Sequence, residues 1–250
     1  MEWEEPGIIL DVRPFGEADA LATVMTEAHG AHRGLARGGQ SRSRAGLWQP
    51  GNLVQARWIG RLSDNLGSFA AEMVHPAAAI ALDDPLLLAM LRAACAVAEG
   101  ALPEREPHPR IFAGLLNLLA RLALGPSLLA EQIGWERVLL ADLGYGLDLA
   151  TCAVTGATEE LAFVSPKSGR AVSLAAAGIW KERLLPLPAF LLGDPAPPGP
   201  ADWRDGLRLT GHFLGRDVFG LQHKQLPQSR LALYDRVAAL AADLETDPNV

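Results

Sequence analysis

The sequence predicts an α+β protein in which a small β-barrel precedes a mainly α-helical region. Three observations lead to this fold class. Within roughly the first 75 residues, five short strand-like segments are separated by turns rich in Gly and polar residues. Beyond His75-Pro76, apolar residues recur at three- and four-residue spacing, which is typical of helices. The 49% apolar fraction is rich in Ala and Leu, which favours helix over strand for the larger part of the chain.

The predicted strands have β-rich or alternating patterns and end at turn residues. They are Gly7–Arg13, Ala20–Thr26, His32–Arg37, Leu53–Ile59 and Ser68–Val74. In the fourth segment, strand alternation favours a core position for Trp58, whereas Trp48 beside Pro50-Gly51 remains undecided. Five short strands with polar connections fit a closed barrel of the OB-fold type, and a β-sandwich fits the pattern almost as well.

The helical region is predicted from start signals and from apolar spacing. We expect helices from Asp83-Asp84-Pro85 to about Gly100, around Ile111–Leu122, from Pro126-Ser127 to Gly144, and from near Gln228 to the C-terminal end. The last helix is expected to place one set of residues on its buried side: Leu231, Tyr234, Val237, Ala238, Ala241 and Leu244. A β-hairpin is expected at about 161–173. We therefore predict two domains, residues 1–78 and 79–250.

Charge is distributed unevenly along a chain whose net charge is −7. Between Ala28 and Ser63 there is no Asp or Glu, and the segment contains six arginines. These are Arg33, Arg37, Arg42, Arg44, Arg57 and Arg61. The local field, rather than the net charge, decides where a phosphate backbone binds. The charge pattern alone is equally compatible with two interpretations. One is a nucleic-acid site with Trp48 and Trp58 as base-stacking candidates, and the other is a solvated surface balanced by neighbouring acids.

Motifs for catalysis are missing. The sequence contains no G-x-x-x-x-G-K-[ST], H-E-x-x-H or G-x-S-x-G motif. Cys95 and Cys152 are the only cysteines, so a four-sulfur zinc site is excluded. We expect no cofactor, no metal and no enzymatic activity. The acidic N-terminus is unlike a signal peptide, and apolar stretches are interrupted by arginine before they reach the ~20 residues of a membrane span. These features predict a cytoplasmic protein.

Several segments, taken in order, resemble the RecO family of recombination mediators. In the N-terminal part they are Gly7-Ile8-Ile9-Leu10, Pro14–Asp19, Thr26–Gly30, Gly34–Gly38, Ser41–Arg44 and Leu47–Gly51. Farther on they are Tyr145–Leu149, Cys152–Gly156, Phe163–Arg170 and Arg183–Pro188. The resemblance covers nearly the whole chain, and its specificity lies in the order and spacing of the segments.

The resemblance implies an N-terminal OB-fold, a helical C-terminal domain, and binding and annealing of single- and double-stranded DNA in repair and recombination. It also implies two protein partners, RecR and the acidic C-terminal tail of the single-stranded DNA-binding protein, and a nucleoid-associated location. Many members carry a four-cysteine zinc ribbon where this chain has Cys152 and the hairpin. Because three of those thiols are absent here, we expect packing alone to hold the hairpin.

We predict that the six arginines contact DNA phosphates, with Lys167 and Arg170 at the hairpin tip as further contacts. An alternative is a protein-interaction adaptor with an incidental basic patch. In that case, a groove between helices near Leu115–Leu139 holds an acidic partner tail, and Arg121 or Arg137 meets its charge.

Overall fold

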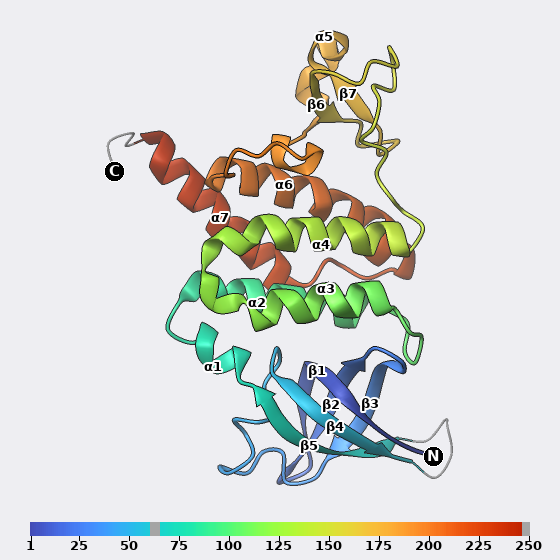
Figure 1. Cartoon of the computed structure of the whole chain (residues 1–250), viewed down its shortest axis with the longest axis vertical. Helices are drawn as coiled ribbons and strands as arrows, with labels where there is room; N and C mark the ends of the chain where they lie inside the picture. The colour runs from blue at the N-terminus through green and yellow to red at the C-terminus, as the bar shows by residue number, and fades with distance from the viewer. Residues whose placement is uncertain (61–65, 247–250) are drawn as a thin grey trace. The chain divides into compact units, whose positions relative to one another are not determined.

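The computed structural model describes residues 1–60 and 66–246 and divides into two compact units, Met1–Pro126 and Ser127–Val250. Figure 1 shows strands in the first unit and mostly helices in the second, with a small sheet. The predicted α+β class is confirmed. Among the helices of the described ranges, none is long and apolar enough to cross a membrane.

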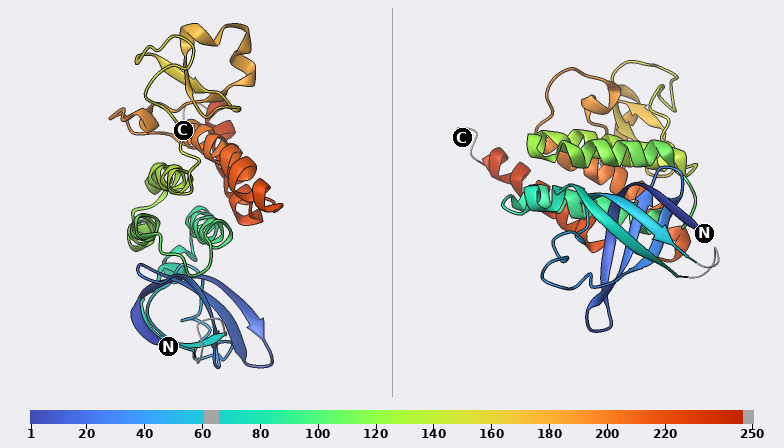
Figure 2. Two further views of the ribbon diagram at one scale, coloured as in Figure 1. Left: turned by 90° about the vertical axis from the view of Figure 1, so that its right-hand side faces the viewer. Right: turned by 60° about the horizontal axis from the view of Figure 1, so that its bottom comes forward.

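The first unit begins with a closed five-stranded barrel in the order β1-β2-β3-β5-β4. Its strands are β1 (Glu2–Phe15), β2 (Asp19–Thr26), β3 (Gly30–Ala36), β4 (Leu53–Ile59) and β5 (Gly67–His75). β3 and β5 are parallel, whereas the other neighbouring strands are antiparallel, and β1 closes the barrel against β4. The left view of Figure 2 shows the barrel as a ring. All five predicted segments are strands, as an OB-fold requires.

The barrel core is built around Trp58, which is fully buried as predicted. Its Nε1 donates a hydrogen bond to the Arg33 carbonyl at 3.2 Å. Gly67 makes room for the indole, because a Cβ at this position would lie 2.2 Å from Trp58 Cε2. Trp48 and Phe69 belong to the same cluster and are also buried. Both tryptophans are therefore core residues: the prediction for Trp58 is confirmed, Trp48 is now assigned to the core, and neither side chain is available for base stacking.

Three helices complete the first unit: α1 (Ala77–Ala81), α2 (Pro85–Ala101) and α3 (Pro109–Ala120). The Asp84 carboxylate caps α2 by accepting hydrogen bonds from the backbone amides of Leu86 and Leu87, at 2.8 and 3.1 Å. α2 packs against β1 and α3 against β4. These helices share a compact unit with the barrel, while the predicted division at residues 78 and 79 stays a prediction. The short 3₁₀ turns η1 (Leu122–Leu124) and η2 (Pro126–Leu128) follow α3.

The second unit combines three long helices with a three-stranded sheet of order β7-β6-β8. Its regular elements are α4 (Leu129–Asp142), β6 (Leu161–Val164), β7 (Ala171–Ser173), α5 (Leu174–Ala177), β8 (Leu185–Pro186), α6 (Pro200–Phe213) and α7 (Gln228–Thr246). Shorter helical turns are η3 (Gly178–Arg183), η4 (Ala189–Leu192), η5 (Leu214–Phe219) and η6 (Gly220–Gln222). β6 and β7 form the expected hairpin. α6 was not predicted.

The buried face of α7 agrees only in part with the predicted one. Val237 and Ala241 are buried as predicted, but Leu231 and Leu244 are 39% and 45% exposed. Arg230 and Leu233, which were not predicted, are buried. Arg230 lies inside because its guanidinium forms an ion pair with the fully buried Glu136 of α4, with Nε and Oε1 2.5 Å apart. The Thr210 hydroxyl of α6 donates to the other carboxylate oxygen at 2.5 Å. A polar cluster thus joins α4, α6 and α7, and it turns α7 away from its purely apolar face.

Candidate nucleic-acid interface

The segment between β3 and β4, residues 37–51, is called the arginine loop here. Consecutive turns fold it: the amides of Arg44 and Ala45 both donate to the Ser41 carbonyl, at 3.0 and 2.8 Å. Buried Asn52 anchors it, because Asn52 Nδ2 donates to the carbonyls of Gly46 and Leu47 at 2.9 and 3.0 Å. The backbone of the loop is therefore held in a defined conformation.

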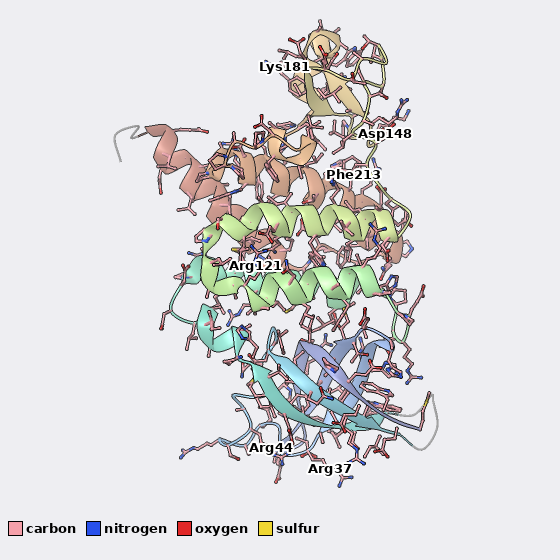
Figure 3. The ribbon with its side chains drawn as sticks, in the orientation of Figure 1. Arg37, Arg44, Arg121, Asp148, Lys181 and Phe213 are labelled. Carbon is pink, nitrogen blue, oxygen red and sulfur yellow. The ribbon has the colours of Figure 1, made fainter. Side chains whose placement is uncertain are left out.

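Three exposed arginines project from the arginine loop: Arg37, Arg42 and Arg44. Within the described ranges 1–60 and 66–246, no carboxylate forms an ion pair with any of them. Arg44 Nη1 donates to the Arg37 carbonyl at 3.4 Å, which brings two of the three close together. Figure 3 shows Arg37 and Arg44 at the end of the barrel opposite α2 and α3. Because their charge is uncompensated, these three guanidinium groups can meet phosphates without first breaking an ion pair.

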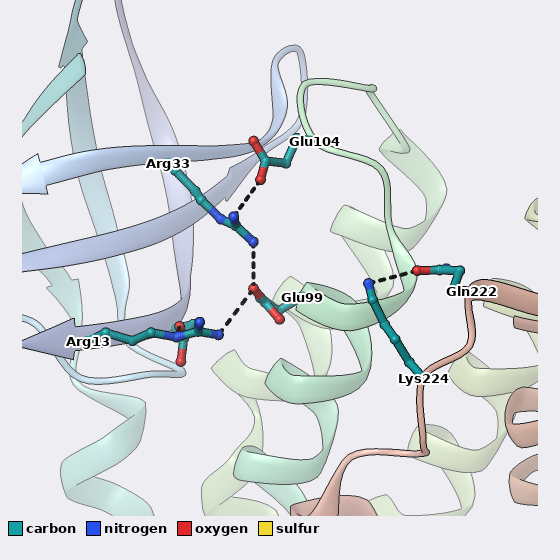
Figure 4. A network of polar contacts seen from close by, with 7 residues as sticks. Arg13, Arg33, Glu99, Glu104, Gln222 and Lys224 are labelled. Carbon is teal, nitrogen blue, oxygen red and sulfur yellow. Dashed lines mark hydrogen bonds and ion pairs between the residues drawn. The ribbon is translucent and has the colours of Figure 1, made fainter. Parts of the chain in front are cut away.

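Arg33 has a different environment from the loop arginines. Its guanidinium lies 3.2 Å from Glu99 Oε1 in α2 and 2.9 Å from Glu104 Oε1. Arg13 approaches the same Glu99 oxygen at 3.8 Å and also pairs with Asp11 at 2.7 Å, so two cations and three carboxylates form one network (Figure 4). The positive charge of Arg33 is therefore largely balanced by neighbouring carboxylates.

Arg57 is also paired, because its Nε lies 2.6 Å from Glu2 Oε1 on the neighbouring strand β1. Arg61 lies outside the described residues. The six arginines of the acid-free segment therefore do not form one uncompensated patch. Of the five described arginines in this segment, Arg37, Arg42 and Arg44 are the ones without a carboxylate partner among the described residues.

The remaining predicted contact residues, Lys167, Arg170, Arg137 and Arg121, have different surroundings. Lys167 is exposed at the hairpin tip, while Arg170 Nε lies 3.2 Å from Asp148 Oδ2. Arg137 Nη1 donates to the Leu191 carbonyl at 3.0 Å. Arg121 follows α3 in the first unit, so the two arginines assigned to a partner groove belong to different units.

The segment before the hairpin does not fit a zinc ion. Across the described part of the chain, no three His, Cys, Asp or Glu side chains gather as metal ligands. The buried Cys152 sulfur instead accepts hydrogen bonds from Ser173 N and Oγ, at 3.3 and 3.5 Å. Hydrogen bonds from Ser173 and Thr155 lower the pKa of this thiol to about 6. The expectation that packing alone holds the hairpin was wrong, since polar contacts tie Cys152 to β7.

Comparison with known proteins places both parts of the chain in one family. Residues 1–77 match the model for the Recombination protein O N-terminal domain, and residues 82–227 match the model for its C-terminal domain. The chain is 60% identical over 242 residues to the DNA repair protein RecO of Granulibacter bethesdensis, covering 96% of this chain and 97% of the relative. It is 57% identical over 240 residues to that of Acidiphilium cryptum, covering 95% and 96%. It is 54% identical over 245 residues to that of Gluconacetobacter diazotrophicus, covering 96% of each. The chain belongs to the RecO family of DNA repair proteins.

Proposed function

We propose that the protein binds single- and double-stranded DNA through the arginine loop and anneals complementary strands, without breaking a covalent bond. One observation carries the proposal: Arg37, Arg42 and Arg44 are exposed on one ordered loop and have no carboxylate partner among the described residues. Guanidinium groups in such a setting bind phosphate oxygens irrespective of base sequence. Membership of a DNA repair family supports DNA as the polyanion.

Annealing requires the repulsion between two polyanionic strands to be lowered. Cationic side chains that neutralise phosphates reduce this repulsion and release condensed counterions. Arg37, Arg42 and Arg44 hold one strand. Lys167 supplies a further contact from the second unit, and Arg170 supplies a weaker one because it also pairs with Asp148. Arg33 and Arg57 contribute little, because phosphate binding there competes with existing carboxylate partners.

The proposal includes the partners that the family resemblance implies. RecR and the acidic tail of the single-stranded DNA-binding protein bring the chain to DNA during recombinase loading, in the cytoplasm and on the nucleoid. The adaptor alternative differs in one respect: the chain binds the tail peptide through Arg121 or Arg137 and does not bind DNA. Titrating labelled single-stranded DNA and the tail peptide separately distinguishes the two, because an adaptor binds only the peptide.

The direct test is strand annealing by the whole chain. Two complementary labelled oligonucleotides are mixed with and without the protein, and pairing is followed by fluorescence transfer. We expect the protein to accelerate pairing, and we expect acceleration to fall as salt rises. The absence of acceleration at low salt would contradict the proposal. A parallel incubation with DNA, Mg²⁺ and ATP should give neither cleavage nor ATP hydrolysis, and any turnover would contradict the non-enzymatic account.

A further inference from the structure

A groove of about 540 Å³ in the first unit adjoins the arginine loop. The groove is lined by Gly46, Gln49 and Pro50 of the loop, by Ala79 and Leu82 of the α1 region, and by residues of α2. Leu82 is 68% exposed, so an apolar surface is left open to solvent. The phosphate contacts proposed above do not use this space.

The chemistry of the walls combines small apolar surfaces with a few polar atoms. Gln49 and Arg92 are the long polar side chains in the lining. Gln49 Nε2 donates to the Ala45 carbonyl at 2.8 Å, which fixes the side-chain amide and leaves its oxygen as an acceptor. Arg92 is exposed and supplies donors. A nucleobase has two flat apolar faces and an edge of donors and acceptors, so its surface matches these walls.

The groove is continuous with the loop that carries the free arginines. Ala45 lines the groove and directly follows Arg44, so their Cα atoms are about 3.8 Å apart. A strand whose phosphates lie on Arg42 and Arg44 is therefore bound next to a residue that lines the groove.

The charge near the mouth favours a polyanion. No acidic side chain lines the groove. Of the two acids that follow Leu82, Asp84 is occupied in capping α2, and Asp83 is exposed. The positive charges of Arg42, Arg44 and Arg92 still outnumber these two carboxylates.

We propose that this groove holds one unpaired nucleobase of the single strand bound by the arginine loop. The inference rests on the proposed function and adds a means of preferring unpaired strands, because a duplex offers a base only after a pair has been opened. The aliphatic walls take the base faces, while Gln49 and Arg92 contact its edge.

The test compares two labelled strands of equal length, oligo-dT and an abasic deoxyribose-phosphate strand, by fluorescence anisotropy with the full chain. The wild-type protein is expected to bind oligo-dT about 5- to 30-fold more tightly than the abasic strand. Gly46→Leu fills the groove, since a Cβ at Gly46 meets no atom within 4 Å. This variant should lose the preference by weakening oligo-dT binding alone. Ala79→Leu, which enlarges a lining residue of α1, should have the same effect.

Ser43→Leu is the matched control, because it adds the same side chain to the loop outside the lining and should keep the preference. Unchanged thermal unfolding of each variant shows that it has folded. Equal binding of both strands by the wild-type protein, or an unchanged preference in both groove-filling variants, would overturn the inference. A triple variant, Arg37→Ala/Arg42→Ala/Arg44→Ala, separates this inference from the proposed function. If the groove inference fails but the triple variant binds both strands more weakly than the wild type, DNA binding by the arginine loop still holds. If the triple variant binds both strands like the wild type, the groove inference and the proposed function both fail. Loss of binding to an Asp/Leu-rich peptide in Gly46→Leu with unchanged DNA affinity would identify a protein site and also overturn the inference.

Discussion

Removing one partner of the buried ion pair between Glu136 and Arg230 should strongly destabilise the second unit. In the Arg230→Met variant, the Glu136 carboxylate would lose the Nε contact at 2.5 Å and the Nη2 contact at 2.9 Å. The Thr210 hydroxyl would remain its partner, and the Leu207 carbonyl would lose the donor that now lies 2.8 Å away. Glu136 is fully buried, so water cannot replace these donors. We expect unfolding free energy to fall by about 3–5 kcal/mol, the usual cost of an uncompensated buried charge.

Urea denaturation followed by tryptophan fluorescence measures this change, because Trp135, Trp180 and Trp203 report on the second unit. The double variant Glu136→Leu/Arg230→Met removes both charges and should recover most of the lost stability. A loss below about 1 kcal/mol in the single variant would refute the reasoning. A double variant no more stable than the single variant would also refute it.

Three further predictions concern individual side chains. Asp84→Ala removes the cap of α2 and should cost about 1 kcal/mol in thermal unfolding, whereas Asp84→Asn should retain most of that stability. Trp58→Ala should cost about 3–5 kcal/mol, and an unfolding midpoint close to that of the wild type would contradict its core role. Thiolate absorbance at 240 nm should appear with a midpoint near pH 6, because Ser173 and Thr155 lower the pKa of Cys152. Burial raises the pKa of Cys95 to about 12, so this second thiol should not contribute thiolate absorbance near pH 6. Folding lowers the Cys152 pKa from 9.0 to about 6. The thiolate should therefore increase the unfolding free energy as pH rises from about 6 to 9, and this contribution should be lost as pH falls through 6. Ser173→Ala should move the absorbance midpoint upward, and an unmoved midpoint would contradict the hydrogen-bond account.

The strands could be predicted because their signals are local. Alternation within Leu53–Ile59 was sufficient to place Trp58 inside the barrel, and the Gly- and Pro-containing turns marked the strand ends. The start of α2 could be predicted for the same reason, since Asp84-Pro85 combines a capping residue with a residue suited to the first turn. In contrast, α6 follows a Pro-rich stretch and contains Gly206 and Gly211, which weaken a helical pattern.

Whether each arginine is paired with a carboxylate could not be predicted, because its partner is distant in sequence. Arg33 is neutralised by Glu99, which lies 66 positions later, and Arg57 by Glu2, which is 55 positions away. A run without acids therefore gives no assurance that a guanidinium is free. The inward turn of Arg230 has the same cause, since its partner Glu136 is 94 positions away. The anchoring role of Asn52 also escaped prediction, although a lone Asn after Pro50-Gly51 was a signal for side-chain bonding to a turn.

The salt dependence of single-strand binding tests the central claim most directly. With about 0.7 counterions released per phosphate contact, roughly five contacts give a log–log slope of about −3 to −4 for the wild-type protein. Replacing Arg37, Arg42 and Arg44 by Ala should make the slope shallower by about 2, since three contacts are lost. Replacing the carboxylate-paired Arg33 and Arg57 should change it by much less. Equal slopes for the wild-type and triple-variant proteins, or a larger change in the Arg33/Arg57 variant, would contradict the assignment of DNA binding to the arginine loop.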